Sequence, residues 1–371
     1  MTASVATGLV RGPRPDAEHA ARAVRAALER AGLARANAIV LFLTPHYARN
    51  PQAALRAAAR EGGCMQVIGC TGAGILTDQE WVLDSPGAAA MVFGGDISLN
   101  LARPSSDEAP ILSLCTPSQL SAEWLDIPLP RIGAISGDLA GQGPFKVWQS
   151  GRVSESGRAE AMFDGARGAI SASQGVRALT SPIEVAEVQG FDVLRLGNYP
   201  ALNVLVKSLP VGVREMERIP LHLIMGAVTF GDPATAIREG RYRLNHIVAA
   251  NLNNQSITLA QRLNRGERLF WAMRDTLAAE RDMRMTLDRT EESLGEKPDF
   301  ALLFPCMGRG PHFYGKTDRD LELMQARFPG LPIIGMYGNG EIGPLDEGNH
   351  LYQYSAVVGL FRRARGGNQL H

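Results

Sequence analysis

The sequence predicts an α/β protein with two related strand–helix–strand units, β-rich central segments and mixed sheets. Short, uninterrupted apolar runs such as Ala38–Leu43 are typical of buried parallel strands. Amphipathic segments such as 15–33 separate these runs and favour covering helices. In addition, Val67–Leu76 aligns without gaps with Ile333–Ile342, and the two segments share one isoleucine and three glycines. This match, with a strand and a helix before each copy, indicates a structural duplication.

The first unit should contain, in order, a helix over 15–33, a strand over 38–43, a helix over 50–63 and strands over 65–69 and 88–93. Asn50 and Pro51 are expected to open the second helix, as a capping residue and a first-turn proline. Gly62 and Gly63 should end it. This order predicts a parallel or mixed sheet with a right-handed crossover.

The middle of the chain differs in composition from the first unit. Residues 130–209 are rich in glycine and β-branched residues, and they predict a β-rich region that continues through 221–230 and 247–250. A long charged helix is expected over 266–293, either as a solvated cover or as a partner-docking helix. The last part repeats the opening pattern, with a strand over 300–304, a helix over 317–328 capped by Thr317, and strands over 332–335 and 356–360.

Length and composition restrict the class of protein. A chain of 371 residues suggests two domains. Lys and Arg together number 38, as do Asp and Glu, so the charge balance does not favour a nucleic-acid partner. No apolar run approaches the ~20 residues needed to span a membrane, and no signal peptide is evident, so a cytoplasmic protein is expected. The four cysteines have no CxxC spacing, and no metal site is predicted.

The first candidate ligand-binding segment is the glycine-rich loop Gly69–Gly74, which follows a predicted strand. Glycine lets the backbone approach a ligand closely, and such a loop can point several N–H groups at an anion. The spacing is neither the dinucleotide fingerprint nor a phosphate-binding P-loop. The alternative is a tight turn required only for packing. The candidate contacts are Cys70, Thr71, Gly72 and Gly74.

The second candidate segment is Cys306–Gly310, where Gly308 and Gly310 flank Arg309. The planar fork of arginine suits a ligand carboxylate or phosphate. Arg309 could instead bond loop carbonyls or a structural acid. Cys306 could act as a nucleophile if a base lay close, but buried cysteines usually behave as small apolar residues.

The third candidate segment contains Asn339, Gly340 and Glu341. Arg309 would hold an acidic group and Glu341 a basic one, so a cleft between them would suit a zwitterion such as an amino acid. An internal Arg309–Glu341 ion pair is the alternative. His46 and His312 lie at the ends of predicted strands, where each is expected to be a polar loop residue rather than a ligand.

The motifs resemble the FIST family of sensory proteins over 36–362. The resemblance rests on Val67–Gly74, on Gly197–Leu202, and most specifically on the Cys306-Met-Gly-Arg loop and Gly340–Pro344. It implies an N-terminal helix over 1–35, a FIST N-type domain over 36–218, a FIST C-type domain over 219–362 and a flexible tail over 363–371.

The resemblance also implies a function. FIST proteins are expected to bind small ligands such as amino acids or other small anions, without catalytic residues, and to report to a separate partner such as a histidine kinase. One branch resembles haem-based nitric-oxide sensors that regulate a kinase or a cyclic-di-nucleotide enzyme. A haem sensor of this kind, with His46, His312 or a cysteine as the candidate axial ligand, is therefore one alternative. A cysteine-dependent enzyme that uses Cys306 is the other, and the cofactor is otherwise unknown.

Overall fold

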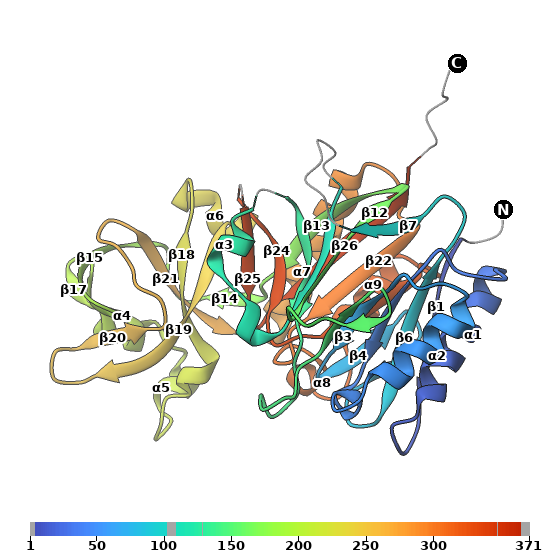
Figure 1. The fold of residues 1–371 in the computed structure, drawn as a ribbon. Coiled ribbons are helices and arrows are strands. Elements are labelled where there is room, and N and C mark those ends of the chain that lie inside the picture. The colour runs from blue at the N-terminus through green and yellow to red at the C-terminus, as the bar shows by residue number, and fades with distance from the viewer. Residues whose placement is uncertain (1–3, 102–108, 128, 347, 365–371) are drawn as a thin grey trace. The chain divides into compact units, whose positions relative to one another are not determined.

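Residues 4–101, 109–127, 129–346 and 348–364 are described in the computed structural model of the chain (Figure 1). They divide into two compact units. The first combines the residues up to Ser173 with those from Met283 onward, and the second is Gln174–Asp282. The expected boundary between the N-type and C-type domains, at residues 218 and 219, stays a prediction. Most of the expected tail over 363–371 lies outside the described residues.

The described part of the first unit forms three six-stranded mixed sheets. The first has the order β1-β6-β2-β3-β10-β11, with bounds Val5–Arg11, Gly87–Phe93, Ala38–Leu43, Val67–Thr71, Val147–Gln149 and Arg152–Val153. The second has the order β7-β12-β8-β9-β24-β25, with bounds Ser98–Leu101, Arg158–Asp164, Ile111–Cys115, Arg131–Ile135, Glu341–Leu345 and Gly348–Tyr352. The third has the order β13-β26-β22-β23-β4-β5, with bounds Ala166–Ser173, Ala356–Arg363, Phe300–Pro305, Ile333–Tyr337, Gly74–Thr77 and Trp81–Val82.

The three sheets repeat one topology. Each has a single parallel pair at its centre, β2 with β3, β8 with β9, and β22 with β23, and its other neighbours are antiparallel. The hairpin that follows the second parallel strand always joins another sheet: β4-β5 joins the third, β10-β11 the first and β24-β25 the second. The predicted duplication is therefore one part of a threefold repeat, whose copies are interlocked by the exchanged hairpins.

One glycine in each parallel pair shows how closely the repeats agree. Gly69, Gly133 and Gly335 hold equivalent registers, opposite Leu41, Ser113 and Leu303. A Cβ atom on these glycines would lie 1.7, 1.8 and 1.6 Å from the carbonyl oxygen of the opposing residue. No side chain fits at that distance, so the backbone contact requires glycine in all three sheets.

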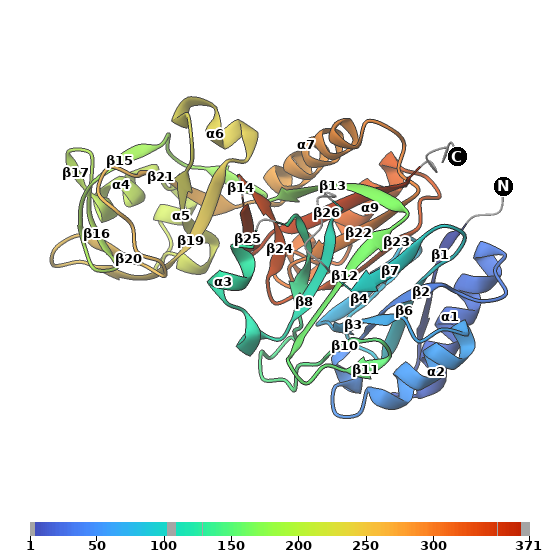
Figure 2. The same ribbon diagram turned by 45° about the horizontal axis from the view of Figure 1, so that its top comes forward.

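Helices cover the outer faces of the sheets. α1 (Ala17–Ala31) and α2 (Gln52–Gly62) lie against the first sheet, as Figure 2 shows. α9 (Arg319–Arg327) and the later part of α7 (Thr276–Leu294) pack on the third, and the short α3 (Ala122–Leu125) packs on the second. The inner faces share one hydrophobic core, where Phe42 contacts Phe304 edge to face.

The second unit is built on a closed ring of strands. The ring runs in the order β21-β15-β16-β20-β19-β18, with bounds Arg268–Arg274, Ile183–Gln189, Asp192–Leu196, Ser256–Leu259, Tyr242–Asn251 and Ile224–Thr229. It closes because β18 pairs with both β19 and β21, which removes exposed strand edges. The remaining elements are β14 (Val176–Ala178), β17 (Tyr199–Pro200), α4 (Ala201–Ser208), α5 (Val211–Arg214) and α6 (Pro233–Glu239).

Several local predictions are corrected by the structure. The expected helix over 266–293 is wrong in its first part, because Arg268–Arg274 is strand β21, whose consecutive apolar residues are buried in the ring. Residues 5–11, which were not predicted as a strand, form β1. Asn50 does not cap α2, since Pro51 holds that position. The cap of α9 is Asp318 rather than Thr317, and its carboxylate accepts from the Leu321 N–H.

Candidate functional site

The loops that follow the second parallel strand of each sheet meet at one place. We call these loops, residues 71–74, 135–138 and 337–340, the strand-end cluster. Three backbone hydrogen bonds link them in a cycle: Ala73 N–H to Tyr337 O at 2.9 Å, Gly137 N–H to Thr71 O at 3.3 Å and Asn339 N–H to Ile135 O at 3.0 Å. Thr71, Gly72 and Asn339, all proposed from sequence, are thus brought together.

Sequence reasoning did not identify Ser136 in the second loop. Its hydroxyl lies 2.9 Å from the Thr71 hydroxyl and donates to the Thr71 carbonyl at 2.7 Å. Both side chains are buried. The signal in the sequence was Arg131–Asp138, where Gly133 aligns with Gly69 and Gly335. Ser136 and Asp138 stand where the other two copies have glycines.

The first parallel strand of each sheet also ends at an equivalent position. Thr44, Thr116 and Cys306 donate their N–H groups to Gly87 O at 3.1 Å, Gly157 O at 2.9 Å and Ser355 O at 2.8 Å, respectively. Cys306 therefore occupies, in the third repeat, the place that a threonine holds in the other two. Its backbone forms a bridge to Gly338, so Cys306 lies directly beside the strand-end cluster.

Glu341 follows the third loop and is completely buried. The Ser355 hydroxyl donates to its Oε2 at 2.8 Å, whereas its Oε1 has no hydrogen-bond partner among the described atoms. Burial raises the pKa of this carboxyl well above its usual value, and hydrogen bonds from Ser355 and the Cys306 thiol oppose the increase only in part. Burial therefore favours the neutral form of this carboxyl.

The position of Glu341 in its sheet makes the buried carboxyl unusual. It pairs with Ala134 across the exchanged hairpin. The equivalent pairs in the other two sheets place Ile75 opposite Met336 and Val147 opposite Cys70. Two of the three equivalent positions are therefore apolar, and the third carries an acid that costs free energy to bury.

The fork of Arg309 is used within the protein. It donates to both carboxylate oxygens of Asp320 at 2.9 Å, and to the carbonyl and hydroxyl oxygens of Ser173 at 2.6 and 2.8 Å. The Tyr314 hydroxyl also donates to Asp320, at 3.0 Å. Asp320 is therefore a structural acid of the kind that the sequence analysis gave as the alternative to ligand binding. Ligand binding by Arg309 stays a prediction.

A further acidic group lies next to this ion pair. Asp318 accepts a hydrogen bond from the Tyr337 hydroxyl and is almost fully buried. Burial, together with the nearby charge of Asp320, raises the pKa of the Asp318 carboxyl to about 6. Sequence reasoning did not identify Asp318 as a candidate site residue.

The other glycines and Cys70 have packing roles that their sequence context left open. A Cβ on Gly72 would lie 2.6 Å from the Met336 sulfur, and Gly340 has a φ of +131° that other residues rarely adopt. Gly74 begins β4, and Gly308 precedes the buried Arg309. Cys70 points into the shared core, where burial raises the pKa of its thiol well above the usual value.

The two candidate histidines lie on short helical turns. His46 is largely exposed on the turn Pro45–Tyr47, with Nδ1 3.2 Å from the Thr44 hydroxyl, and partial desolvation of its ring lowers its pKa. His312 is exposed on α8 (Pro311–Tyr314). Exposed imidazoles on such turns do not form the enclosed pocket that a haem requires, so these residues do not fit that group.

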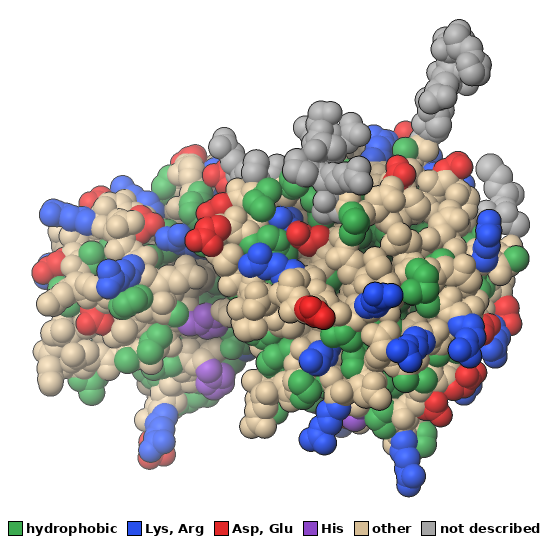
Figure 3. Space-filling model, in the orientation of Figure 1, with side chains coloured by type: hydrophobic (Ala, Val, Ile, Leu, Met, Phe, Trp, Pro, Cys, Tyr) green, Lys and Arg blue, Asp and Glu red, His purple; other side chains and the backbone are tan. Residues whose placement is uncertain are grey.

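The described residues hold neither a metal-ion cluster nor a helix suited to crossing a membrane. Among them, no group of three or more His, Cys, Asp or Glu side chains is arranged to hold a metal ion. No described helix combines the length and the apolar character needed to cross a membrane. Figure 3 shows acidic and basic side chains interspersed on the face in view.

The sequence is similar to two known protein domains and to mycobacterial proteins. The FIST N domain matches residues 37–198, and the FIST C domain matches residues 198–344. An uncharacterized protein of Mycobacterium tuberculosis (Rv0628c) is 29% identical over 251 residues, which are 66% of this chain and 65% of that protein. An uncharacterized protein of Mycobacterium bovis (Mb0898c) is 28% identical over 249 residues, 66% of this chain and 64% of that protein. The chain thus spans slightly less than two thirds of the length of these relatives. Because the two domain models together cover most of its length, the chain belongs to the FIST family and carries a FIST N domain followed by a FIST C domain.

Proposed function

We propose that this protein is a sensor that binds a small ligand at the strand-end cluster and reports it to a separate signalling partner, such as a histidine kinase. FIST domains are small-ligand sensory domains of signal transduction, which supports this class of function. The ligand class that we favour is an amino acid or another small carboxylate.

The observation that carries the proposal is the buried carboxyl of Glu341. Burial favours the neutral form of this carboxyl, and the Ser355 hydroxyl donates to Oε2, so a proton on Oε1 would be a donor without a described acceptor. A buried donor without an acceptor costs about 1–3 kcal/mol. A ligand carboxylate that accepted this hydrogen bond would remove that cost, and the polar side chains of the strand-end cluster, Thr71, Ser136 and Asn339, would supply its further contacts.

The test uses a substitution that the repeat itself supplies. Glu341→Ile copies Ile75 from the equivalent position of another sheet, so it should fold. A thermal-shift screen would test amino acids, small carboxylates, phosphorylated metabolites and haem. A ligand at 100 times its Kd stabilises the folded state by about 2.7 kcal/mol. We expect one carboxylate class to raise the Tm of the wild type and of the control variant Ile75→Val, but not that of Glu341→Ile.

Two results would contradict the proposal. One is the absence of a shift with every class of compound. The other is an equal shift in the wild type and in Glu341→Ile, which would place the ligand elsewhere in the protein.

A further inference from the structure

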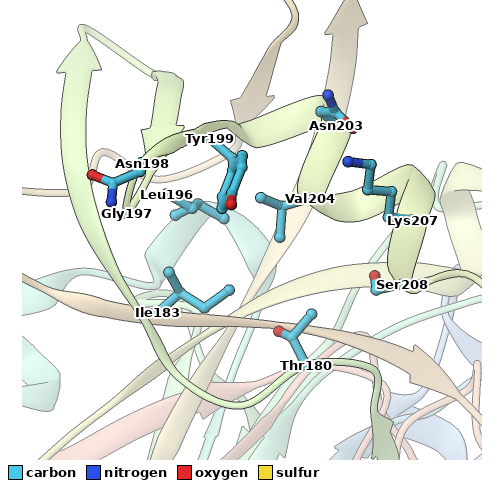
Figure 4. Close-up of a pocket in the computed structure, with 10 residues that line it drawn as sticks. All are labelled: Thr180, Ile183, Leu196, Gly197, Asn198, Tyr199, Asn203, Val204, Lys207 and Ser208. Atoms are coloured by element: carbon cyan, nitrogen blue, oxygen red, sulfur yellow. The ribbon is translucent and has the colours of Figure 1, made fainter.

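A second candidate site lies entirely within the unit Gln174–Asp282. It is a surface pocket of about 590 Å³, between the start of β15, the turn from β16 to β17, and α4 (Figure 4). This volume is within the range typical of small-molecule sites, about 300–1,000 Å³. The site shares no residue with the strand-end cluster.

The pocket has an apolar lining. Ile183, Leu196 and Val204 contribute aliphatic side chains from three different elements. Tyr199 lies at its rim with 62% of its surface exposed, and Figure 4 shows its hydroxyl directed toward the space between Ile183 and Val204. A ligand with an apolar body would therefore bury both aliphatic and aromatic surface.

The charge in the pocket has one sign. Among its described lining residues, Lys207 of α4 is the one Lys, Arg, Asp or Glu. Its ammonium lies 5.9 Å from the centre of the Tyr199 ring, and it forms no ion pair with any described residue. Glu184, the acid next to Ile183 in sequence, is instead paired with Arg268 at 3.6 Å. An anionic group on the ligand would meet a cation that has no carboxylate partner in this part of the chain.

Neutral polar groups complete the lining. The side chains of Asn198 and Asn203 offer amide donors and acceptors. The Ser208 hydroxyl is already bonded to the Leu205 carbonyl at 2.7 Å, and the Thr180 hydroxyl oxygen accepts from the Trp271 N–H at 3.0 Å. With no acid in the lining to receive an ammonium, the pocket disfavours amino acids. With one cation above apolar residues, it suits a monoanion better than a phosphate ester.

We propose that this pocket binds a small monocarboxylic acid with an apolar body, such as an arylalkanoic or branched-chain acid. The carboxylate would contact Lys207 and an adjacent amide. The apolar body would contact Tyr199, Ile183 and Val204. This inference is independent of the strand-end cluster, so either site can be present without the other.

The test is titration calorimetry of the whole protein with four matched compounds: phenylacetate, its neutral amide, phenethylamine and L-phenylalanine. We expect phenylacetate to bind most tightly. Lys207→Met removes the charge and keeps most of the apolar stem, and it should weaken phenylacetate binding by at least about tenfold, which corresponds to about 1.4 kcal/mol. Lys207→Arg should retain binding, and Lys297→Met is the matched control in the other unit.

Charge reversal provides a second, independent test. Lys207→Glu should bind phenethylamine in preference to phenylacetate, because the rest of the lining is unchanged. Glu341→Ile should leave phenylacetate binding intact, which separates this site from the strand-end cluster. The proposal fails if the wild type binds none of the four compounds, if phenethylamine binds as well as phenylacetate, or if Lys207→Met binds phenylacetate as the wild type does.

Discussion

Replacing Arg309 with methionine would leave the carboxylate of Asp320 buried without its cation. The side chains of this pair are 1% and 0% exposed, and two parallel hydrogen bonds of 2.9 Å join them. The same substitution removes the two bonds to Ser173. Removing one partner of a buried ion pair costs about 3–5 kcal/mol, and we expect a loss of this size in the free energy of unfolding.

Urea unfolding followed by tryptophan fluorescence would measure this loss, because three of the four tryptophans lie in the unit that contains Arg309. Arg25→Met is the matched control. Its pair with Glu61 has a similar distance of 2.7 Å, but the side chains are 50% and 26% exposed. Exposed pairs contribute about 0–1 kcal/mol, so the control should differ little from the wild type.

A double variant separates the charge from the packing. Arg309→Met combined with Asp320→Leu removes both charges, so it should recover part of the stability that the single variant loses. If Arg309→Met were no less stable than Arg25→Met, the structural role assigned to Arg309 would be wrong.

Two further predictions concern the packing and the titration of the same unit. Gly335→Ala should destabilise the protein by more than about 3 kcal/mol in urea unfolding, because its Cβ would lie 1.6 Å from the Leu303 carbonyl oxygen, whereas Gly212→Ala, which meets nothing within 4 Å, should be nearly neutral. The pKa of Asp318 is raised from 3.8 to about 6 in the folded state, so its contribution to stability is present below pH 3.8 and is lost as the pH rises toward 6. Asp318→Asn should therefore reduce the fall in unfolding free energy over this pH range, and an unchanged pH profile would contradict the assignment.

Elements with one strong local signal could be predicted from sequence. The continuous apolar runs at Ala38–Leu43 and Phe300–Pro305 are strands because both of their faces are buried. The segment Arg268–Arg274 was expected to be helical, because a short apolar run next to a charged helix fits both the helical and the strand periodicity. This segment forms a strand because it pairs with distant strands and is buried in the closed ring.

The repeat in the second sheet could not be recognised from its local sequence. Arg131–Asp138 has the essential glycine at Gly133, but it lacks the second and third glycines of the other copies in register. The crossover helix between its parallel strands has one turn, Ala122–Leu125, so the neighbouring pattern is also weak. The exchange of hairpins between sheets is a long-range pairing that leaves no local pattern.

The sequence by itself determined the fold class, the residue types at the strand ends and the family, because these depend on local apolar runs, glycines and short motifs. The tertiary structure alone decided which groups meet. Arg309 could have paired with either Glu341 or Asp320, and the packing of α9 placed Asp320 at hydrogen-bonding distance. The pKa of Glu341 is raised because the second sheet buries it where the equivalent positions of the other sheets hold Ile75 and Val147. Burial and pairing of this kind are properties of residues far apart in the chain, so no local stretch of sequence records them.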